Sequence, residues 1–154
     1  MDRLKQKLLV EQIDRKINKF RPLESEDIPA EGWIYAIRTA LHMSLRQLGK
    51  RLGISLQGIK QLEIREKEQS ITIKKLKEVG QALDMKFIYG FIPYDGSIEN
   101  MIDKRAGELA DNIVMRTSRT MELEDQKVID SRLKEAIKNR KEEILAKMPR
   151  YLWD

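Results

Sequence analysis

A series of closely spaced helix-start signals in the middle of the chain constrains its fold more than any other feature. Ser44, Ser55 and Thr72 each precede an apolar periodic segment, which is the position of a helix N-cap. Gln47 follows Ser44 by three residues, the spacing of a capping box. Gly53 lies between the first two signals, where a residue in the left-handed conformation ends a helix. The pattern predicts short helices joined by tight turns.

Apolar residues recur at helical spacing after each of these signals, and one more helix is expected before them, over Trp33 to Leu41. Four short helices in about fifty residues, each with its own boundary signals, are typical of a small helical bundle. The residues predicted to face its core are Ile34, Ile37, Ala40, Leu41, Leu45, Leu48, Leu52, Ile59, Leu62, Ile73, Leu76, Val79 and Leu83.

The segment from Met85 to Pro93 alternates large apolar residues with other residues, which is typical of a β-strand. No second convincing strand is visible to satisfy its backbone hydrogen bonds. Two interpretations remain open: the segment pairs with its own copy as a ribbon across a two-fold axis, or it packs on the domain as an extended segment. The ribbon is preferred, and its predicted dimer strand contains Phe87, Ile88, Tyr89 and Phe91.

Helices are also predicted on both sides of this region. Asp2 to Phe20 carries one apolar stripe, and an acidic linker follows from Leu23 to Glu31. After Ser97 a second stripe runs almost to Pro149, with a break or kink expected between Arg116 and Thr120. This third of the chain therefore contains one or two long helices. The predicted domains are residues 1–31, 32–96 and 97–154.

The chain ends in a short aromatic segment after Pro149. Its composition differs from that of the preceding helical stripe, and we predict that it is a distinct tail that docks a partner. The docking residues would be Tyr151, Leu152 and Trp153.

The net charge of +5 is concentrated in one segment. Residues 32–97 contain eleven basic and six acidic side chains, whereas residues 1–31 contain seven of each and residues 98–154 twelve of each. A basic surplus of this size on one small domain is expected of a surface that binds nucleic-acid phosphates.

Composition argues against several other classes of protein. The chain has no cysteine, and its single histidine, His42, is expected at the surface, so neither a nucleophile–base pair nor a metal cluster is visible. No apolar run approaches the roughly 18 residues that span a bilayer. We therefore expect a soluble, cytoplasmic protein that is not an enzyme and that uses no metal, cofactor or membrane.

The residues between Ala36 and Leu83 resemble the Cro/C1-type (XRE-like) helix-turn-helix family. The resemblance implies a mainly α fold: a lambda-repressor-like helix-turn-helix bundle, here with one β-strand and long N- and C-terminal helices. It also implies that the chain binds double-stranded DNA. Gly49 is expected where two helices cross closely. The matching elements are Ser44–Gly49, Leu52–Ser55, Ile59–Glu63, Thr72 and the helix over Leu76–Leu83.

The helix that begins after Ser55 is predicted to read DNA bases. Glutamine can pair with adenine through two hydrogen bonds, and lysine can reach guanine or a phosphate. Leu56 stands where a polar reader is usual in the family, and it could touch a thymine methyl group. Gly58 either allows a close approach to the DNA backbone or fills a small packing position. The predicted base-reading residues are Ser55, Leu56, Gln57, Lys60 and Gln61.

Phosphate contacts are expected around this reading face. The N-termini of the two helices after Ser44 and Ser55 present free backbone amides, which bind phosphate oxygens. Basic side chains nearby would add further contacts. The predicted phosphate-binding residues are Ser44, Arg46, Gln47, Arg65, Lys67, Lys74 and Lys75.

Outside this region the chain resembles the family called mobile mystery protein A. The similar features are the charged N-terminal helix, the segment Thr120–Gln126 and the ending Leu152–Asp154. The resemblance implies a gene beside that of a Fic-domain partner on a mobile element, with this chain as operon repressor and antitoxin. Fic inhibitors share a Ser/Thr-x-x-x-Glu-Gly/Asn motif. The near matches that begin at Ser118, Thr120 and Ser131 all lack the last element, so no such motif is predicted.

Two functional hypotheses follow. The leading one is a dimeric repressor that binds an inverted repeat, with one half-site for each reading helix. The alternative is a protein-interaction module, in which the terminal helices and the aromatic tail restrain a partner enzyme and DNA binding is secondary.

Overall fold

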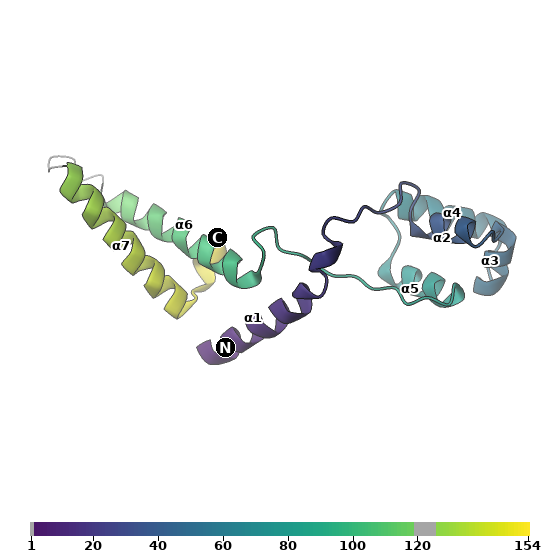
Figure 1. Ribbon diagram of the computed structural model, residues 1–154, viewed down its shortest axis with the longest axis horizontal. Helices are drawn as coiled ribbons and strands as arrows, with labels where there is room; N and C mark the ends of the chain where they lie inside the picture. The colour runs from purple at the N-terminus through teal and green to yellow at the C-terminus, as the bar shows by residue number, and fades with distance from the viewer. Residues whose placement is uncertain (1, 119–125) are drawn as a thin grey trace. The chain divides into compact units, whose positions relative to one another are not determined.

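A computed structural model describes residues 2–118 and 126–154 of the chain (Figure 1). Its contacts divide the chain into two compact units. The central unit is Ser25–Tyr89, and the terminal unit combines Met1–Glu24 with Gly90–Asp154. The three domains predicted along the sequence remain a prediction.

The central unit contains the four predicted short helices, which are thereby confirmed: α2 (Trp33–Ala40), α3 (Leu45–Leu52), α4 (Leu56–Lys67) and α5 (Ile73–Ala82). The expected N-caps are also confirmed. Ser44 Oγ accepts a hydrogen bond from Gln47 N at 3.1 Å, and the Gln47 side chain accepts one from Ser44 N at 2.8 Å, which completes the capping box. The hydroxyl oxygens of Ser55 and Thr72 accept hydrogen bonds from Gly58 N and Lys75 N, and these residues thereby cap α4 and α5.

The core of the central unit lies where the inward faces of α2 to α5 meet. Ala40, Leu41 and Ile73 were predicted to face this core, and that prediction was wrong because all three are exposed. Each lies at a helix end, where the helical spacing of apolar residues no longer fixes which side is covered. The buried core residues are Ile34, Leu48, Ile59, Leu62, Val79 and Leu83.

Two carboxylates of α4 hold α2 in place. Glu66 accepts hydrogen bonds from the backbone amides of Trp33 at 2.5 Å and Ile34 at 2.9 Å, so it caps a helix whose own N-cap residue is Gly32. Glu63 forms an ion pair with Arg38, with 2.5 Å between Arg38 Nε and Glu63 Oε1, and both side chains are about nine-tenths buried. Arg38 also donates to the carbonyl oxygen of Met43 at 3.0 Å.

The β-strand predicted over Met85–Pro93 was wrong. The structure contains no strand among residues 2–118 and 126–154, and Phe87, Ile88, Tyr89 and Phe91 lie in irregular extended backbone. The part of the segment that belongs to the central unit, residues 85–89, instead lies against α5: Met85 N donates to the carbonyl oxygen of Gly80 at 2.8 Å. The Phe87 and Tyr89 rings stack with centroids 6.0 Å apart, and Lys77 Nζ lies 5.7 Å from the centroid of the Tyr89 ring. Of the alternating apolar residues Met85, Phe87, Tyr89 and Phe91, only Phe87 is half-buried, so the alternation does not correspond to a buried and an exposed side of a strand.

The terminal unit is built on two long helices that lie side by side, α6 (Ile98–Ser118) and α7 (Gln126–Lys147) (Figure 1). A short 3₁₀ helix, η2 (Arg150–Trp153), follows α7 and packs on α6. The core is small: Ala106, Ala110, Ile144 and Leu152 are buried. The predicted break between Arg116 and Thr120 and the segment Thr120–Gln126 extend into residues that the structure does not describe.

The N-terminal helix α1 (Arg3–Asn18) also packs on α6. The Asp14 carboxylate accepts hydrogen bonds from the backbone amides of Ile98 at 2.8 Å and Glu99 at 3.2 Å, and it thereby caps α6. Arg21, in the short helix η1 (Arg21–Leu23), donates to the carbonyl oxygen of Gly96. None of the residues Arg3–Asn18, all of which the structure describes, is buried.

Within residues 2–118 and 126–154, no helix has the length and apolar character needed to cross a bilayer.

The buried pair Arg38–Glu63 yields a prediction about stability. Glu63→Ala leaves a buried guanidinium without its counter-charge and should lower the free energy of unfolding by about 3–5 kcal/mol. The measurement is urea denaturation in a Trp153→Phe background, where Trp33 of the central unit is the remaining tryptophan. Glu68→Ala, at an exposed position of the same segment, is the control and should change stability little. Equal effects of the two substitutions would contradict the role of the pair.

Candidate nucleic-acid interface

The turn between α3 and α4 fixes the direction of the predicted reading helix. Gly53 ends α3 in the left-handed conformation, with φ of 70°, as expected. A Cβ on Gly49 would lie 2.6 Å from the carbonyl oxygen of Ile54, so the close approach is between α3 and the turn. A close crossing of two helices was expected at Gly49, but the neighbour is the backbone of the turn residues Ile54 and Ser55 and not the second helix.

The side of α4 opposite the core presents the predicted base-reading residues. Ile59 and Leu62 are buried, whereas Ser55, Gln57, Lys60 and Gln61 are exposed and Leu56 is half-buried. Ser55 Oγ accepts a hydrogen bond from Gly58 N at 3.0 Å, so its hydroxyl oxygen already serves as the helix cap. The side chains of Gln57, Lys60 and Gln61 follow one exposed face of a helix that the core anchors.

Gly58 fills a small packing position within α4. A Cβ there would lie 3.2 Å from Ile54 Cδ1, which is tighter than an ordinary van der Waals contact, and 3.4 Å from Ser55 Oγ. Of the two explanations for this glycine, the contacts favour packing against Ile54. The glycine lowers helix propensity by roughly 0.5–1 kcal/mol relative to alanine.

The predicted phosphate-binding residues fall into two groups. Arg46, Arg65 and Lys74 are exposed and form no ion pair with another residue of the described chain. In contrast, Lys67 Nζ lies 2.8 and 3.0 Å from the two carboxylate oxygens of Glu31. Lys75 Nζ lies 2.7 Å from Glu78 Oε2.

The ion pair between Lys75 and Glu78 changes the pKa of the Glu78 carboxyl group. The hydrogen bond from Lys75, followed by its charge, holds the pKa of Glu78 below its ordinary value. At neutral pH Glu78 is therefore a carboxylate, and a DNA phosphate would have to compete with it for Lys75. Ser44 and Gln47, also predicted to bind phosphate, are exposed at the start of α3, and their side chains form the capping box.

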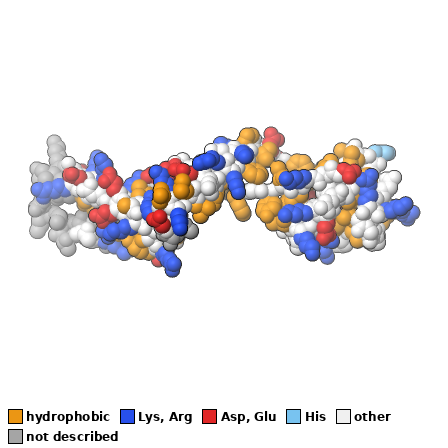
Figure 2. Space-filling model, turned by 90° about the horizontal axis from the view of Figure 1, so that it is seen from below, with side chains coloured by type: hydrophobic (Ala, Val, Ile, Leu, Met, Phe, Trp, Pro, Cys, Tyr) orange, Lys and Arg blue, Asp and Glu red, His pale blue; other side chains and the backbone are white. Residues whose placement is uncertain are grey.

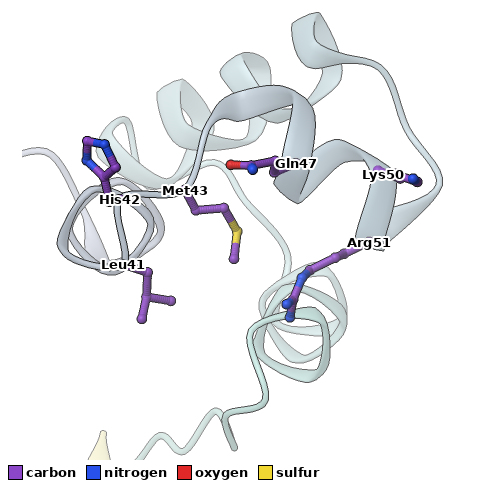
Figure 3. Close-up of a pocket in the computed structure, with 6 residues that line it drawn as sticks. All are labelled: Leu41, His42, Met43, Gln47, Lys50 and Arg51. Atoms are coloured by element: carbon purple, nitrogen blue, oxygen red, sulfur yellow. The ribbon is translucent and has the colours of Figure 1, made fainter.

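A shallow depression of the central unit lies between the α2–α3 turn and the outer side of α3 (Figure 3). None of the predicted base readers lines it. Arg51 extends from α3 towards the end of α5, where it donates to the carbonyl oxygen of Ala82 at 3.1 Å (Figure 3). At this edge of the depression, Arg51 therefore serves to link α3 to the end of α5. Its lining residues are Leu41, His42, Met43, Gln47, Lys50 and Arg51.

Basic side chains are dispersed over the visible face of the molecule among apolar and acidic ones (Figure 2). The candidate interface is the exposed face of α4 together with its N-terminal end.

The C-terminal tail is split between anchoring and exposed residues. Leu152 is buried in the core of the terminal unit, whereas Tyr151 and Trp153 are 48% and 56% exposed. Arg105 holds the tail in place: its Nε donates to the carbonyl oxygen of Leu152 and its second terminal nitrogen to that of Asp154, both at 2.6 Å. Leu152 stabilises the chain itself, and its two aromatic neighbours are the residues available to a partner.

The comparison with family models identifies the class of the central unit. Residues 34–89 match the family model described as "Helix-turn-helix", which is of the Cro/C1 type. The central unit is therefore similar to helix-turn-helix domains, and the match supports a DNA-binding regulator of the XRE type.

The match covers just over a third of the chain and does not reach the terminal unit. The similarity to mobile mystery protein A therefore remains a prediction. The comparisons with curated proteins and with solved structures gave no match.

Several residues that shape the interface were missed in the sequence. Arg38 and Glu63 were not predicted to pair, although each follows a core residue by four positions and so lies on an inward helix face. That placement is the signal that could have revealed them. Glu31 and Glu66 gave no comparable signal, because their partners are more than thirty residues away.

The split character of the tail yields a prediction. Leu152→Ala should destabilise the terminal unit by about 2–5 kcal/mol, because it removes a fully buried side chain. Tyr151→Ala should have a small effect, since this ring is half exposed. Thermal unfolding in a Trp33→Phe background, followed by the fluorescence of Trp153, measures both. A larger loss in Tyr151→Ala than in Leu152→Ala would show that the anchor is misassigned.

Proposed function

We propose that the protein is a transcriptional repressor that binds an inverted repeat in its own promoter as a homodimer. The observation that carries the proposal is the exposed polar face of α4, in a unit that matches the helix-turn-helix family model. Each copy would place α4 in the major groove of one half-site. Occupancy of the promoter would then exclude RNA polymerase.

The proposed base contacts follow from side-chain chemistry. Gln57 and Gln61 are four residues apart on α4, so their amides can face successive bases and donate to and accept from adenine. Lys60 can donate to guanine or to a phosphate. Leu56 would cover a thymine methyl group with the part of its side chain that remains exposed.

The proposed phosphate contacts would set the register of α4 on the duplex. The α4 N-terminus presents backbone amides next to Ser55, and Arg46, Arg65 and Lys74 supply side chains without a competing carboxylate in the described chain. Lys67 and Lys75 would contribute only after they leave Glu31 and Glu78.

A role as antitoxin beside a Fic-domain protein is proposed on the resemblance of the terminal regions to mobile mystery protein A. In the alternative function, the chain is an interaction module that restrains a partner enzyme. One observation favours a partner: Tyr151 and Trp153 flank the buried Leu152 and are exposed, and rings of this kind often dominate protein interfaces.

DNA reading by α4 can be tested directly. The double substitution Gln57→Ala and Gln61→Ala should weaken binding to the promoter at least tenfold, since each paired contact contributes about 1–3 kcal/mol of discrimination. Fluorescence anisotropy with labelled promoter DNA at several salt concentrations measures the affinity. Gln81→Ala, an exposed glutamine on α5, is the matched control and should bind as the wild type does. Unchanged affinity of the double variant, with little dependence on salt, would contradict the proposal.

The partner proposal requires a different measurement. The product of the neighbouring gene should be retained by the full chain in a pull-down, and Tyr151→Ala with Trp153→Ala should reduce retention at least tenfold. Both substitutions leave the Leu152 anchor in place, so the terminal unit keeps its fold. Retention equal to that of the wild type would exclude the two rings as the docking residues.

A further inference from the structure

We propose that the terminal unit is the dimerisation module of the protein, and that a second copy of the chain covers an apolar patch beside α1. This inference rests on the proposed function, because an inverted repeat requires two copies. The patch is defined as Leu9, Ile13 and Ile17 of α1, Phe91 and Tyr94 of the extended segment, and Met101 of α6.

The first observation is a helix without a buried residue. α1 carries Leu4, Leu8, Leu9, Val10, Ile13 and Ile17, yet none of its residues is buried within the unit. Leu9, Ile13 and Ile17 follow at four-residue spacing, so they lie in one row along the helix. An apolar row that is left partly exposed by its own unit is normally covered in an assembly.

The second observation is a hollow beside this row. Ile17 lines a hollow of about 320 Å³ together with Phe91, Tyr94, Ile98 and Met101. Phe91 is 84% exposed and Tyr94 is fully exposed, so both rings project from the rim of the hollow that they line. A surface that combines a hollow with projecting rings can fit a rotated copy of itself, as a two-fold interface requires.

The size of the patch fits a dimer. The two rings offer on the order of 300 Å² of apolar surface. The row on α1 and the half-exposed Met101 extend this area towards the about 800 Å² per partner of a stable interface. Among the residues whose burial the structure describes, the core of this unit has four buried side chains, which come from α6, α7 and η2 and none from α1.

Charge favours a second copy in which α1 lies against the partner's α6 over one in which the two α1 helices pair directly. α1 carries five basic and two acidic side chains, a net +3, whereas α6 carries three basic and four acidic ones, a net −1. A pairing of α1 with the partner's α1 would bring like charges together. A two-fold arrangement that lays each α1 row on the partner's extended segment and α6 brings opposite charges together.

The experiment measures the dimer of the full chain by sedimentation velocity over a concentration series. Phe91→Asp and, separately, Ile13→Asp should each raise the dimer dissociation constant at least 100-fold, although they lie on different elements. Tyr151→Asp, an exposed ring elsewhere in the same unit, is the control and should change it less than twofold. A monomeric wild type at tens of micromolar, or equal effects of all three substitutions, would overturn the proposal.

Cross-linking gives an independent test, because the chain has no cysteine. In a mixture of Phe91→Cys chains with Ile13→Cys chains, the two thiols face each other across the proposed interface. A short bis-maleimide should join them at least tenfold faster than in a mixture of Tyr151→Cys chains with Ile13→Cys chains. Equal rates would overturn the interface even if the protein is dimeric.

DNA binding separates this inference from the proposed function. Phe91→Asp should weaken binding to the full inverted repeat at least tenfold and leave binding to a single half-site unchanged within twofold. If Phe91→Asp leaves both affinities unchanged while the Gln57 and Gln61 double variant loses binding, the interface is wrong and DNA reading stands. If Phe91→Asp dissociates the dimer while the glutamine variant keeps its affinity, the interface stands and base reading by α4 is wrong.

Discussion

The position of α4, the predicted reading helix, depends on the close contact between Gly49 and the turn that follows α3. A Cβ on Gly49 would collide with the backbone oxygen of Ile54, and the amide of Ile54 donates to the carbonyl oxygen of Gly49 at 2.9 Å. Neither atom can move without moving the start of α4. Gly53 is required for a different reason. A Cβ there would meet no described atom within 4 Å, so a side chain would mainly incur the cost of the left-handed conformation, about 1–2 kcal/mol. One glycine sets the distance between helix and turn, and the other sets the direction of the chain.

The two ends of α4 serve different purposes. Its first turns expose Gln57, Lys60 and Gln61, whereas Glu63 and Glu66 in its later turns bond to Arg38 and to the N-terminus of α2. Glu63 and Glu66 are three residues apart and so lie on one face, which is directed at α2. Base contacts are sensitive to small displacements of a helix, and α4 is held by the core and by two carboxylates on sides that DNA would not touch. The reading face can therefore be varied in sequence without loss of the contacts that place it.

The helices of the central unit could be predicted because their start signals are local in the sequence. The ion pair of Arg38 with Glu63 and the burial of Leu152 could not, because they depend on residues far away in the chain. The caps at Ser44, Ser55 and Thr72 act within three residues, so spacing alone reveals them. The alternation from Met85 to Pro93 is a local pattern and does not show whether a second strand is present; Phe87, its half-buried member in the central unit, lies against α5 instead. In the sequence, Leu152 could not be distinguished from Tyr151 and Trp153 as a docking residue. Only the packing on α6 and the hydrogen bond from Arg105 show that Leu152 is buried, whereas the two rings are exposed. The base-reading and phosphate-binding residues remain predictions, although the exposure of most of them is compatible with those roles.

The formal charge of the central region overstates the charge that is free to meet DNA. Lys67 and Lys75 already have carboxylate partners, so each phosphate they bind replaces an ion pair within the chain. Exposed ion pairs contribute little to stability, because solvent and salt screen them. The exchange therefore opposes binding only weakly, but it also adds less than a contact made by an unpaired cation. Arg46, Arg65 and Lys74 release bound counterions from DNA without giving up a partner in the described chain, and they should dominate the salt dependence of binding. The number of phosphate contacts inferred from that dependence should consequently be smaller than the number of basic side chains around α4.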